Sequence, residues 1–381
     1  MDAIRAYAIL MMLQGHFIDT MLAPEYRDYS LPLYSLWAFF RGMTAPIFFF
    51  SSGLVFMYLL VKDTRPLKEN VRVQKGIRRG LMLIGLGYVL KLGLPNVVTL
   101  RIYPYHYAVD VLHCIGLAIL SLIGIYALHR KFQFSLRVVL GVLAILIFSL
   151  EPFLEKLDWT VMPRFLANYF TLNYGSTFTL VPWLGYAFFG GILGVWLNRQ
   201  PNMAFSKWFP WMVLTTGWLL HQFSSHWLQS LHELTGWYTF AELFKNNYLL
   251  VRLGHVLIAM SVVIWITRWW KNMPALVTKI GSETLTIYGV HYVLLYGTWL
   301  GVGLSTFWKQ ELNPLPAVIG ALLFVISFIV LIAHIEAVRE VVNRQIPVQL
   351  RIAYRLARVK IIRFYLRVWR PVRKILLAFG Q

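Results

Sequence analysis

Three polar residues lie in the first apolar stretch of the chain, "DAIRAYAILMMLQGHFIDTM" at residues 2–21. Arg5 and His16 are eleven residues apart, close to three turns of an α-helix, so they share one face about 16 Å apart along the axis. Asp19 lies three residues beyond His16 and shares that face. A histidine oriented by a carboxylate is a typical general base, and an arginine suits an anionic group. The spacing predicts His16 as a base held by Asp19, with Arg5 as an anion-binding residue.

The same residues also have a purely structural interpretation. Arg5 could be an interfacial cation whose long side chain reaches the membrane surface, and His16 a hydrogen-bonded packing residue. Either polar group costs several kcal/mol if it is left unpaired in hydrocarbon, so partners are expected in both cases. Spacing alone leaves the two interpretations open.

The composition indicates which elements must position these side chains. Of the 381 residues 58% are hydrophobic and only 14% are charged, which excludes an ordinary soluble domain and predicts a polytopic membrane protein. The first apolar stretch lacks the basic n-region and small-residue cleavage site of a secretory signal, so we expect it to be a retained helix. The single cysteine, Cys114, excludes an internal disulfide and a multi-cysteine metal site, and we expect it to be a small core residue with no metal bound.

Apolar runs of about 18 to 25 residues, long enough to cross a bilayer as a helix, recur about ten times. We expect an all-α protein whose transmembrane domain covers residues 1–343. In the second run, Ser51 to Gly53 predict close helix packing. The predicted spans are 4–21, 42–61, 78–94, 109–128, 134–150, 179–197, 208–223, 249–268, 283–301 and 317–338.

The net charge of +20 is distributed by loop. Cations gather after the second, fourth, sixth and eighth runs, whereas the intervening loops hold few cations and most of the acids. The positive-inside rule then places both termini in the cytoplasm of a multi-pass protein of the cell's inner membrane. Arg5 would lie near the cytoplasmic surface, with His16 and Asp19 beyond the midplane. This polar stripe suits the movement of an acyl group from a phosphorylated cytoplasmic donor to an acceptor reached from outside.

The C-terminal segment, residues 344–381, differs in character. Its arginines recur every three to five residues, on one helical stripe among Leu, Ile, Val and aromatic residues. We expect a basic amphipathic helix that binds anionic lipids at the cytoplasmic surface, with each cation worth about 1 kcal/mol. A tail that binds a partner protein or a nucleic acid is the alternative, and its position directly after a span favours the membrane over nucleic acid.

Several motifs resemble those of integral-membrane acyltransferases. The Asp-x-x-Arg-x10-His pattern of residues 2–16 is similar to the first-helix signature of the acyltransferase-3 group and its relatives, "PIFFFSSGLVF" resembles the run in their next helix, and "IGSETLTIYGVHYVLLYG" their late histidine segment. "VDVLHCIGLAIL" and "LVPWLGYAFFGGILG" look most like bacterial relatives of heparan-α-glucosaminide N-acetyltransferase. The five motifs keep the family's order over about residues 1–300.

The resemblance implies an acyltransferase that takes an acyl group, commonly acetyl, from cytoplasmic acyl-coenzyme A. The acceptor in such proteins is a hydroxyl or amine of a sugar or other envelope molecule, glycan or lipid. His16 matches the histidine proposed as the base, Arg5 the motif arginine and His291 the late histidine. The eukaryotic glucosaminide enzyme has its catalytic histidine in the loop after the first helix, but no histidine lies between His16 and His106 here, so His16 must itself supply the base.

Further polar residues complete the predicted site. Tyr288 lies on the face of His291 at helical spacing, and we expect both to contact acyl-coenzyme A together with Arg5. Arg41, His113 and Arg252 lie near predicted helix ends and are candidates for acceptor binding, although aromatic-rich interfaces also use such residues as anchors.

Two other classes of protein remain open. A non-enzymatic scaffold or lipid-binding subunit could keep the acyltransferase fold and dock a membrane-protein partner or a second copy of the chain. A secondary transporter would be expected to show inverted repeats and broken helices at the midplane, and the sequence has no convincing internal symmetry.

Overall fold

The computed structural model describes residues 2–93, 103–245, 247–270 and 272–345, and the regular secondary structure in these ranges is helical. The prediction of an all-α protein is therefore confirmed. Residues 346–381, which make up almost all of the predicted amphipathic segment 344–381, lie outside the described residues, so this helix stays a prediction.

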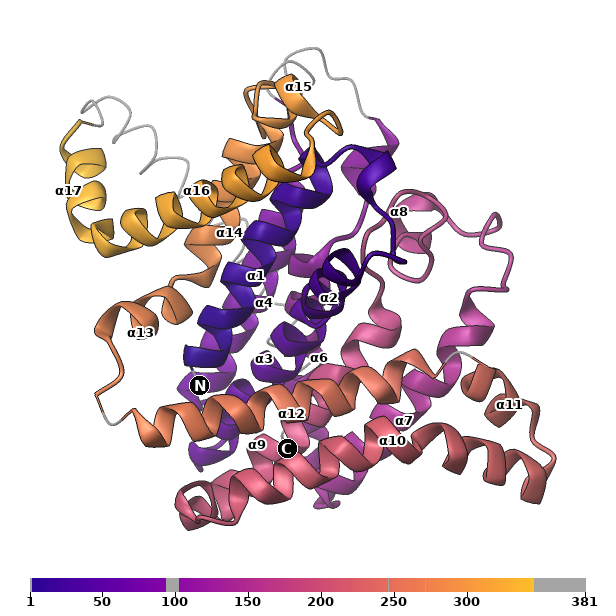
Figure 1. Ribbon diagram of the computed structural model, residues 1–381. Coiled ribbons are helices and arrows are strands. Elements are labelled where there is room, and N and C mark those ends of the chain that lie inside the picture. Colours follow the sequence, from indigo (N-terminus) through magenta and orange to yellow (C-terminus); the bar gives the residue numbers. More distant parts are fainter. Residues whose placement is uncertain (1, 94–102, 246, 271, 346–381) are drawn as a thin grey trace.

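Long helices joined by short loops dominate the chain (Figure 1). The helices are α1 (Asp2–Met21), α2 (Pro32–Arg41), α3 (Thr44–Lys62), α4 (Val71–Val89), α6 (Val111–Phe132), α7 (Leu136–Leu154), α8 (Arg164–Ala167), α9 (Leu180–Arg199), α10 (Phe209–Thr235), α11 (Tyr238–Lys245), α12 (Tyr248–Trp269), α13 (Ala275–Ser282), α14 (Thr284–Tyr296), α15 (Ser305–Trp308), α16 (Pro314–Ala333) and α17 (Ile335–Gln345).

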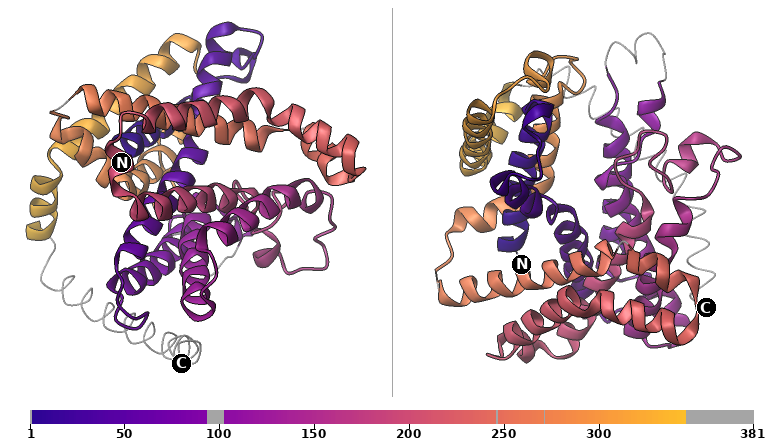
Figure 2. Two further views of the ribbon diagram at one scale, coloured as in Figure 1. Left: turned by 90° about the horizontal axis from the view of Figure 1, so that it is seen from below. Right: turned by 45° about the vertical axis from the view of Figure 1, so that its right-hand side comes forward.

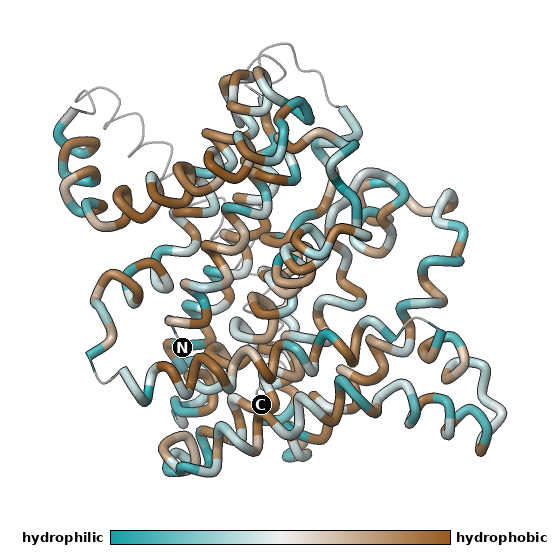
Figure 3. The backbone as a smooth tube through the Cα atoms, in the orientation of Figure 1, coloured by the Kyte–Doolittle hydropathy of each residue, from teal (hydrophilic) through white to brown (hydrophobic). Residues whose placement is uncertain are grey.

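Six helical segments of the described chain are long and apolar enough to cross a membrane. They are Pro32–Lys62, Pro104–Phe132, Leu136–Leu154, Leu180–Arg199, Tyr248–Trp269 and Pro314–Ala333. The other predicted spans fall on α1, α4, α10 and α14, which are helices but more polar or, in the 13-residue α14, too short. Six candidate spans make this a multi-pass membrane protein, and Figure 3 shows almost unbroken hydrophobic colour along α16.

The predicted span 283–301 begins at the break between two helices and ends early, since α14 covers Thr284–Tyr296. Glu283 has non-helical backbone angles and separates α13 from α14. Its carboxylate accepts hydrogen bonds from the Thr286 hydroxyl at 2.6 Å and from Arg339 at 2.8 Å. These bonds hold the start of α14 against α17, and α14 then runs alongside α1.

Close packing of α3 on α9 forms the centre of the molecule. A Cβ atom at Gly53 would lie 1.8 Å from the Ala187 carbonyl oxygen, and one at Gly190 would lie 1.9 Å from that of Phe50. Only glycine allows the two backbones to approach this closely. The close packing predicted for Ser51 to Gly53 is confirmed, and Cys114 is a buried core residue as expected.

Three further groups of helices surround this centre. α10 and α12 lie side by side and run across the direction of α1 (Figures 1 and 2). α4 packs on α6, and α1 packs on α13, α14 and α16. The group around α1 and the pair of α4 and α6 lie on opposite sides of an internal space.

Candidate functional site

A cavity of about 680 Å³ lies between α1, α4, α6 and α14. On α1 its wall extends from Arg5 to Asp19, fourteen positions that correspond to about 21 Å of helix. The lining residues used below are Arg5, His16, Asp19, Arg41, Arg79, Asp110, Ser176, Trp183, Tyr248, Thr284, Tyr288, Tyr292 and Tyr296. The predicted polar stripe of α1 therefore faces one continuous space.

His16 lies on this wall, and its Nδ1 atom has two polar neighbours, both from α14. Nδ1 is 3.1 Å from Nε2 of His291 and 3.3 Å from the Tyr296 hydroxyl. Among the described residues Nε2 of His16 has no hydrogen-bond partner. When Nδ1–H of His16 donates to His291, Nε2 of His16 carries the lone pair that a general base requires.

His291 occupies a different place from the one expected. It is fully buried, contacts His16 and does not line the cavity. Tyr288 does line the cavity, and its ring packs edge-on against His291 at 5.0 Å between centroids. Tyr288 and His291 thus lie together, but only Tyr288 can touch a ligand there.

Asp19 does not hold His16. Its carboxylate forms an ion pair with Arg41, and its backbone oxygen accepts a hydrogen bond from Arg27 at 2.8 Å. The physical reason is that α2 returns Arg41 to the end of α1, and a guanidinium is a stronger partner for a carboxylate than a neutral imidazole. Asp19 and Arg41 line the cavity as a charged pair one helical turn from His16.

Arg5 lines the opposite end of the cavity and is joined there by Arg79 from α4. Arg5 forms an ion pair with Asp2 at 3.6 Å, and the Arg5 and Arg79 charges interact with each other. Thr284, at the start of α14, lies on the same wall. This end of the cavity is cationic, which suits an anionic ligand.

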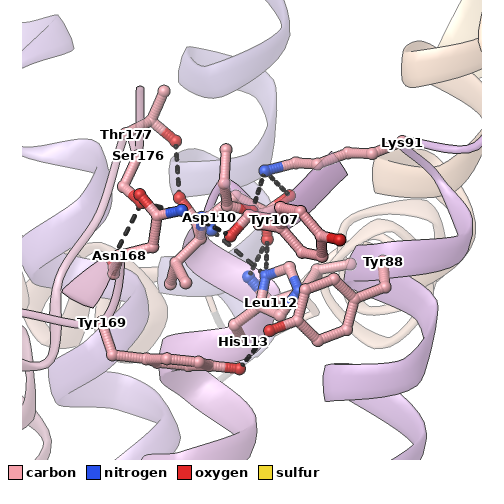
Figure 4. Close-up of polar contacts among 12 residues, drawn as sticks. Tyr88, Lys91, Tyr107, Asp110, Leu112, His113, Asn168, Tyr169, Ser176 and Thr177 are labelled. Atoms are coloured by element: carbon pink, nitrogen blue, oxygen red, sulfur yellow. Dashed lines mark hydrogen bonds and ion pairs between the residues drawn. The ribbon is translucent and has the colours of Figure 1, made fainter. Parts of the chain in front are cut away.

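His113 is fully buried and does not line the cavity, but its neighbour Asp110 does (Figure 4). Asp110 caps the N-terminus of α6, where its Oδ1 atom accepts the backbone N–H of Leu112 at 3.0 Å and lies 2.9 Å from Nδ1 of His113. His113, predicted to bind the acceptor, therefore does not reach the cavity, whereas its carboxylate partner Asp110 does.

Arg252 lies beside the cavity without lining it. It donates a hydrogen bond to the Phe39 carbonyl at 3.1 Å and lies over the rings of Phe39 and Tyr248. Its contacts hold α2, and therefore Arg41, against α12. The predicted acceptor residues thus divide into Arg41, which lines the cavity, and His113 and Arg252, which lie behind it.

Several polar lining residues were absent from the sequence prediction. Four of them, Arg79, Asp110, Tyr292 and Tyr296, could have been found from local signals: the Arg78–Arg79 doublet in α4, the Asp-x-x-His capping pattern before α6, and the tyrosines one and five positions after His291. None of these signals points to the cavity without the packing of distant helices.

Fold and site together define a multi-pass helical membrane protein with a cavity that has a histidine on its wall and two arginines at one end. Residues 1–229, more than half of the chain, match the family model described as heparan-alpha-glucosaminide N-acetyltransferase, catalytic. The chain belongs to this family of membrane acetyltransferases. Comparison with curated proteins and with solved structures found no match to either. The matched range includes His16 and Asp110 and ends before α14.

Proposed function

We propose that this protein transfers an acetyl group from acetyl-coenzyme A to a hydroxyl or amine of an envelope sugar, glycan or lipid, with His16 as the general base. The observation that carries the proposal is the position of His16, whose Nε2 atom is free of partners among the described residues on a cavity that extends from Arg5 to Asp19. The family match supports the transfer of acetyl. The similarity of residues 2–16 to the acyltransferase-3 signature supports the role of His16.

The cationic end of the cavity fits the donor. Arg5 and Arg79 can bind the phosphates of coenzyme A, since guanidinium groups form charge-assisted hydrogen bonds with phosphate oxygens. The narrow acyl-bearing arm of the donor would then extend along α1 past Tyr288 toward His16. In this arrangement Tyr288 contacts the donor, as the sequence predicted, and His291 acts through His16.

The transfer itself needs no nucleophilic side chain. The acceptor oxygen or nitrogen attacks the acetyl carbonyl carbon, the carbon–sulfur bond breaks, and coenzyme A leaves as a thiolate. Nε2 of His16 takes the proton that the acceptor loses and can return it to the leaving thiolate. Binding both substrates in one cavity supplies the proximity, and the bound substrates exclude water that would hydrolyse the thioester.

The topology that we propose gives each substrate its own side of the membrane. In addition to the six candidate spans, α1, α4, α10 and the α13–α14 pair also cross, which gives ten passages with both termini in the cytoplasm of the inner membrane. The alternation of loop charge supports this orientation. Arg5 then faces the cytoplasmic donor, while Asp19 and Arg41 face the outer acceptor.

The C-terminal segment 344–381 is proposed to bind anionic lipids of the inner leaflet, which would anchor the chain beside the donor entrance. A docking role for a membrane-protein partner or a second copy remains the alternative. That role belongs to the scaffold hypothesis, in which the fold is kept without transfer.

The experiment that tests the proposal incubates the purified full-length protein with acetyl-coenzyme A labelled in the acetyl group and an envelope extract. We expect label in the extract that depends on the protein. Binding of acetyl-coenzyme A is measured in parallel by calorimetry. If the protein neither binds acetyl-coenzyme A nor transfers label, the proposal is contradicted and a scaffold is favoured.

A further inference from the structure

A second carboxylate faces the cavity from the wall opposite α1, and the mechanism above does not use it. Asp110 is 1% exposed as a residue, yet it lines the cavity. Its Oδ1 atom accepts the backbone N–H of Leu112 and lies 2.9 Å from Nδ1 of His113, and this Nδ1 atom is also 3.1 Å from the Asp110 backbone nitrogen. Its Oδ2 atom is buried and has no hydrogen bond from a described residue. A carboxylate oxygen can accept two hydrogen bonds, so Oδ2 has unused capacity.

The surroundings of Asp110 hold its carboxylate in place. The Lys91 ammonium lies 3.8 Å from Oδ2 and donates its own hydrogen bond to the Ala108 carbonyl. The N-terminus of α6 adds the favourable end of the helix dipole. Lys91 does not line the cavity, so a ligand inside it meets the carboxylate and not the ammonium.

The His113 ring is held as tightly as the carboxylate. A Cβ atom at Gly87 would lie 2.4 Å from Cε1 of His113, so the ring fills the space that a side chain on α4 would need. The Tyr88 ring packs edge-on against His113 at 4.2 Å, and its hydroxyl is 2.7 Å from that of Tyr169 (Figure 4). The imidazole therefore has one orientation, with Nδ1 toward Asp110.

The segment before α9 supports the same wall of the cavity. The Ser176 hydroxyl accepts the Val109 N–H at 2.9 Å and itself donates to Asn168, whose side-chain amide donates to the Tyr107 carbonyl at 3.0 Å (Figure 4). The backbone just before Asp110 is thus held in place. Such a rigid carboxylate with a free oxygen is suited to the recognition of a hydrogen-bond donor on a ligand.

We propose that Asp110 binds the acceptor through Oδ2, and that His113 positions this carboxylate. The inference rests on the transfer proposed above. Oδ2 accepts a hydrogen bond from a hydroxyl or amine of the acceptor adjacent to the group whose proton His16 removes. The acceptor is then a molecule with at least two neighbouring donor groups, such as a polyol or an amino sugar, and a simple alcohol lacks the second contact.

The test measures transfer of labelled acetyl at saturating acetyl-coenzyme A against increasing amounts of envelope extract. Asp110→Asn keeps the shape and the Oδ1 acceptor but replaces Oδ2 by a donor. We expect the half-saturating amount of extract to rise at least tenfold, with the KM for acetyl-coenzyme A unchanged, because a hydrogen bond to a charged group is lost.

The positioning role of His113 has its own pair of variants. Asn at position 113 can present a side-chain N–H close to where Nδ1 of histidine lies, whereas Leu cannot. We expect His113→Leu to raise the half-saturating amount of extract as Asp110→Asn does, and His113→Asn to restore it to within about threefold of wild type. If His113 had a purely structural role, the side-chain amide of His113→Asn would not restore acceptor saturation.

A steric variant tests the same wall if Asp110→Asn fails to fold, as judged by its thermal unfolding midpoint. Gly87→Ala pushes on the His113 ring without changing the carboxylate, and we expect it too to weaken acceptor saturation. Gly85→Ala is the matched control, since nothing lies within 4 Å of a Cβ atom at Gly85.

The possible failures can be told apart. A folded Asp110→Asn protein with unchanged acceptor saturation overturns the inference and leaves the proposed function intact. Equal loss for donor and acceptor overturns it as well, because Asp110 would then support the whole cavity. A wild-type protein that binds acetyl-coenzyme A and transfers nothing overturns the proposed function, and the inference with it.

Discussion

Two pairs of histidines in this protein have nearly the same geometry and very different surroundings. Nδ1 of His16 is 3.1 Å from Nε2 of His291, and Nε2 of His255 is 3.0 Å from Nδ1 of His221. The first pair joins α1 to α14 at the cavity wall. The second joins α10 to α12, and neither of its members lines the cavity.

The comparison teaches that a hydrogen-bonded histidine pair does not make a site by itself. His255 packs edge-on against Phe39 at 4.9 Å and helps to seat α2, which is a packing role. His16 instead lines a cavity that has Arg5 and Arg79 at one end and the Asp19–Arg41 ion pair at the other. The two pairs therefore differ in their access to the cavity, which only His16 lines.

The largest expected effect separates the two pairs directly. His16→Ala removes the proposed base, and we expect the rate of transfer to fall by about 10²- to 10⁴-fold, the range for loss of general base catalysis. His221→Ala is the matched control and should stay within about twofold of wild type, because this ring faces no cavity. Labelled acetyl transfer by both proteins is the measurement. Equal losses would remove the distinction between the pairs.

The cationic end of the cavity gives the next largest effect. Arg5→Ala or Arg79→Ala should weaken binding of acetyl-coenzyme A by about ten- to a hundredfold, since each loses a charge-assisted hydrogen bond to phosphate. Calorimetry with acetyl-coenzyme A measures the affinity. Arg137→Ala, on α7 and away from the cavity lining, serves as the charge control. Unchanged affinity in both arginine variants would place the donor elsewhere.

A smaller effect is expected at the buried partner of His16. His291→Leu removes the acceptor that fixes the Nδ1–H tautomer, and we expect transfer to fall about tenfold with acetyl-coenzyme A binding retained. His291→Gln offers an amide oxygen near the position of Nε2 and should recover much of the rate. If His291 instead contacted the donor, its loss would raise the KM for acetyl-coenzyme A.

The smallest effect concerns the second neighbour of Nδ1. Tyr296→Phe deletes a hydroxyl 3.3 Å from His16 and keeps the ring, so we expect the rate to fall about threefold, as for one neutral hydrogen bond. Steady-state kinetics of transfer measure this change. A loss as large as that of His16→Ala would show that the tyrosine takes part in the proton transfer.

The sequence predicted the long elements well because they repeat a simple signal. The first span was expected at 4–21 and α1 covers Asp2–Met21, and Arg5 and His16 line one cavity as their eleven-residue spacing implied. α2 was missed, since ten residues with none buried give no spanning signal. The span predicted at 283–301 begins where α14 begins but extends past its end at Tyr296, because an apolar count does not register the left-handed backbone at Gly297.

The spacing of residues along one helix could not predict the partners of the site residues, which come from distant parts of the chain. His16 and His291 are 275 residues apart, and only the resemblance to a family suggested that they belong to one site. Asp19 was paired with His16 because both lie on one helical face, but Arg41, 22 residues along the chain, forms the ion pair instead. Helical periodicity reports which side a residue faces, whereas tertiary packing decides what it meets.

The central claim is that one cavity joins a donor from the cytoplasmic side to an acceptor from the other side. The most direct measurement uses the protein in sealed vesicles of one orientation, with labelled acetyl-coenzyme A at the cytoplasmic face only and envelope extract at the opposite face only. We predict label in the extract for the wild type and its loss for His16→Ala. Transfer that occurs only when both substrates share one face would contradict the claim.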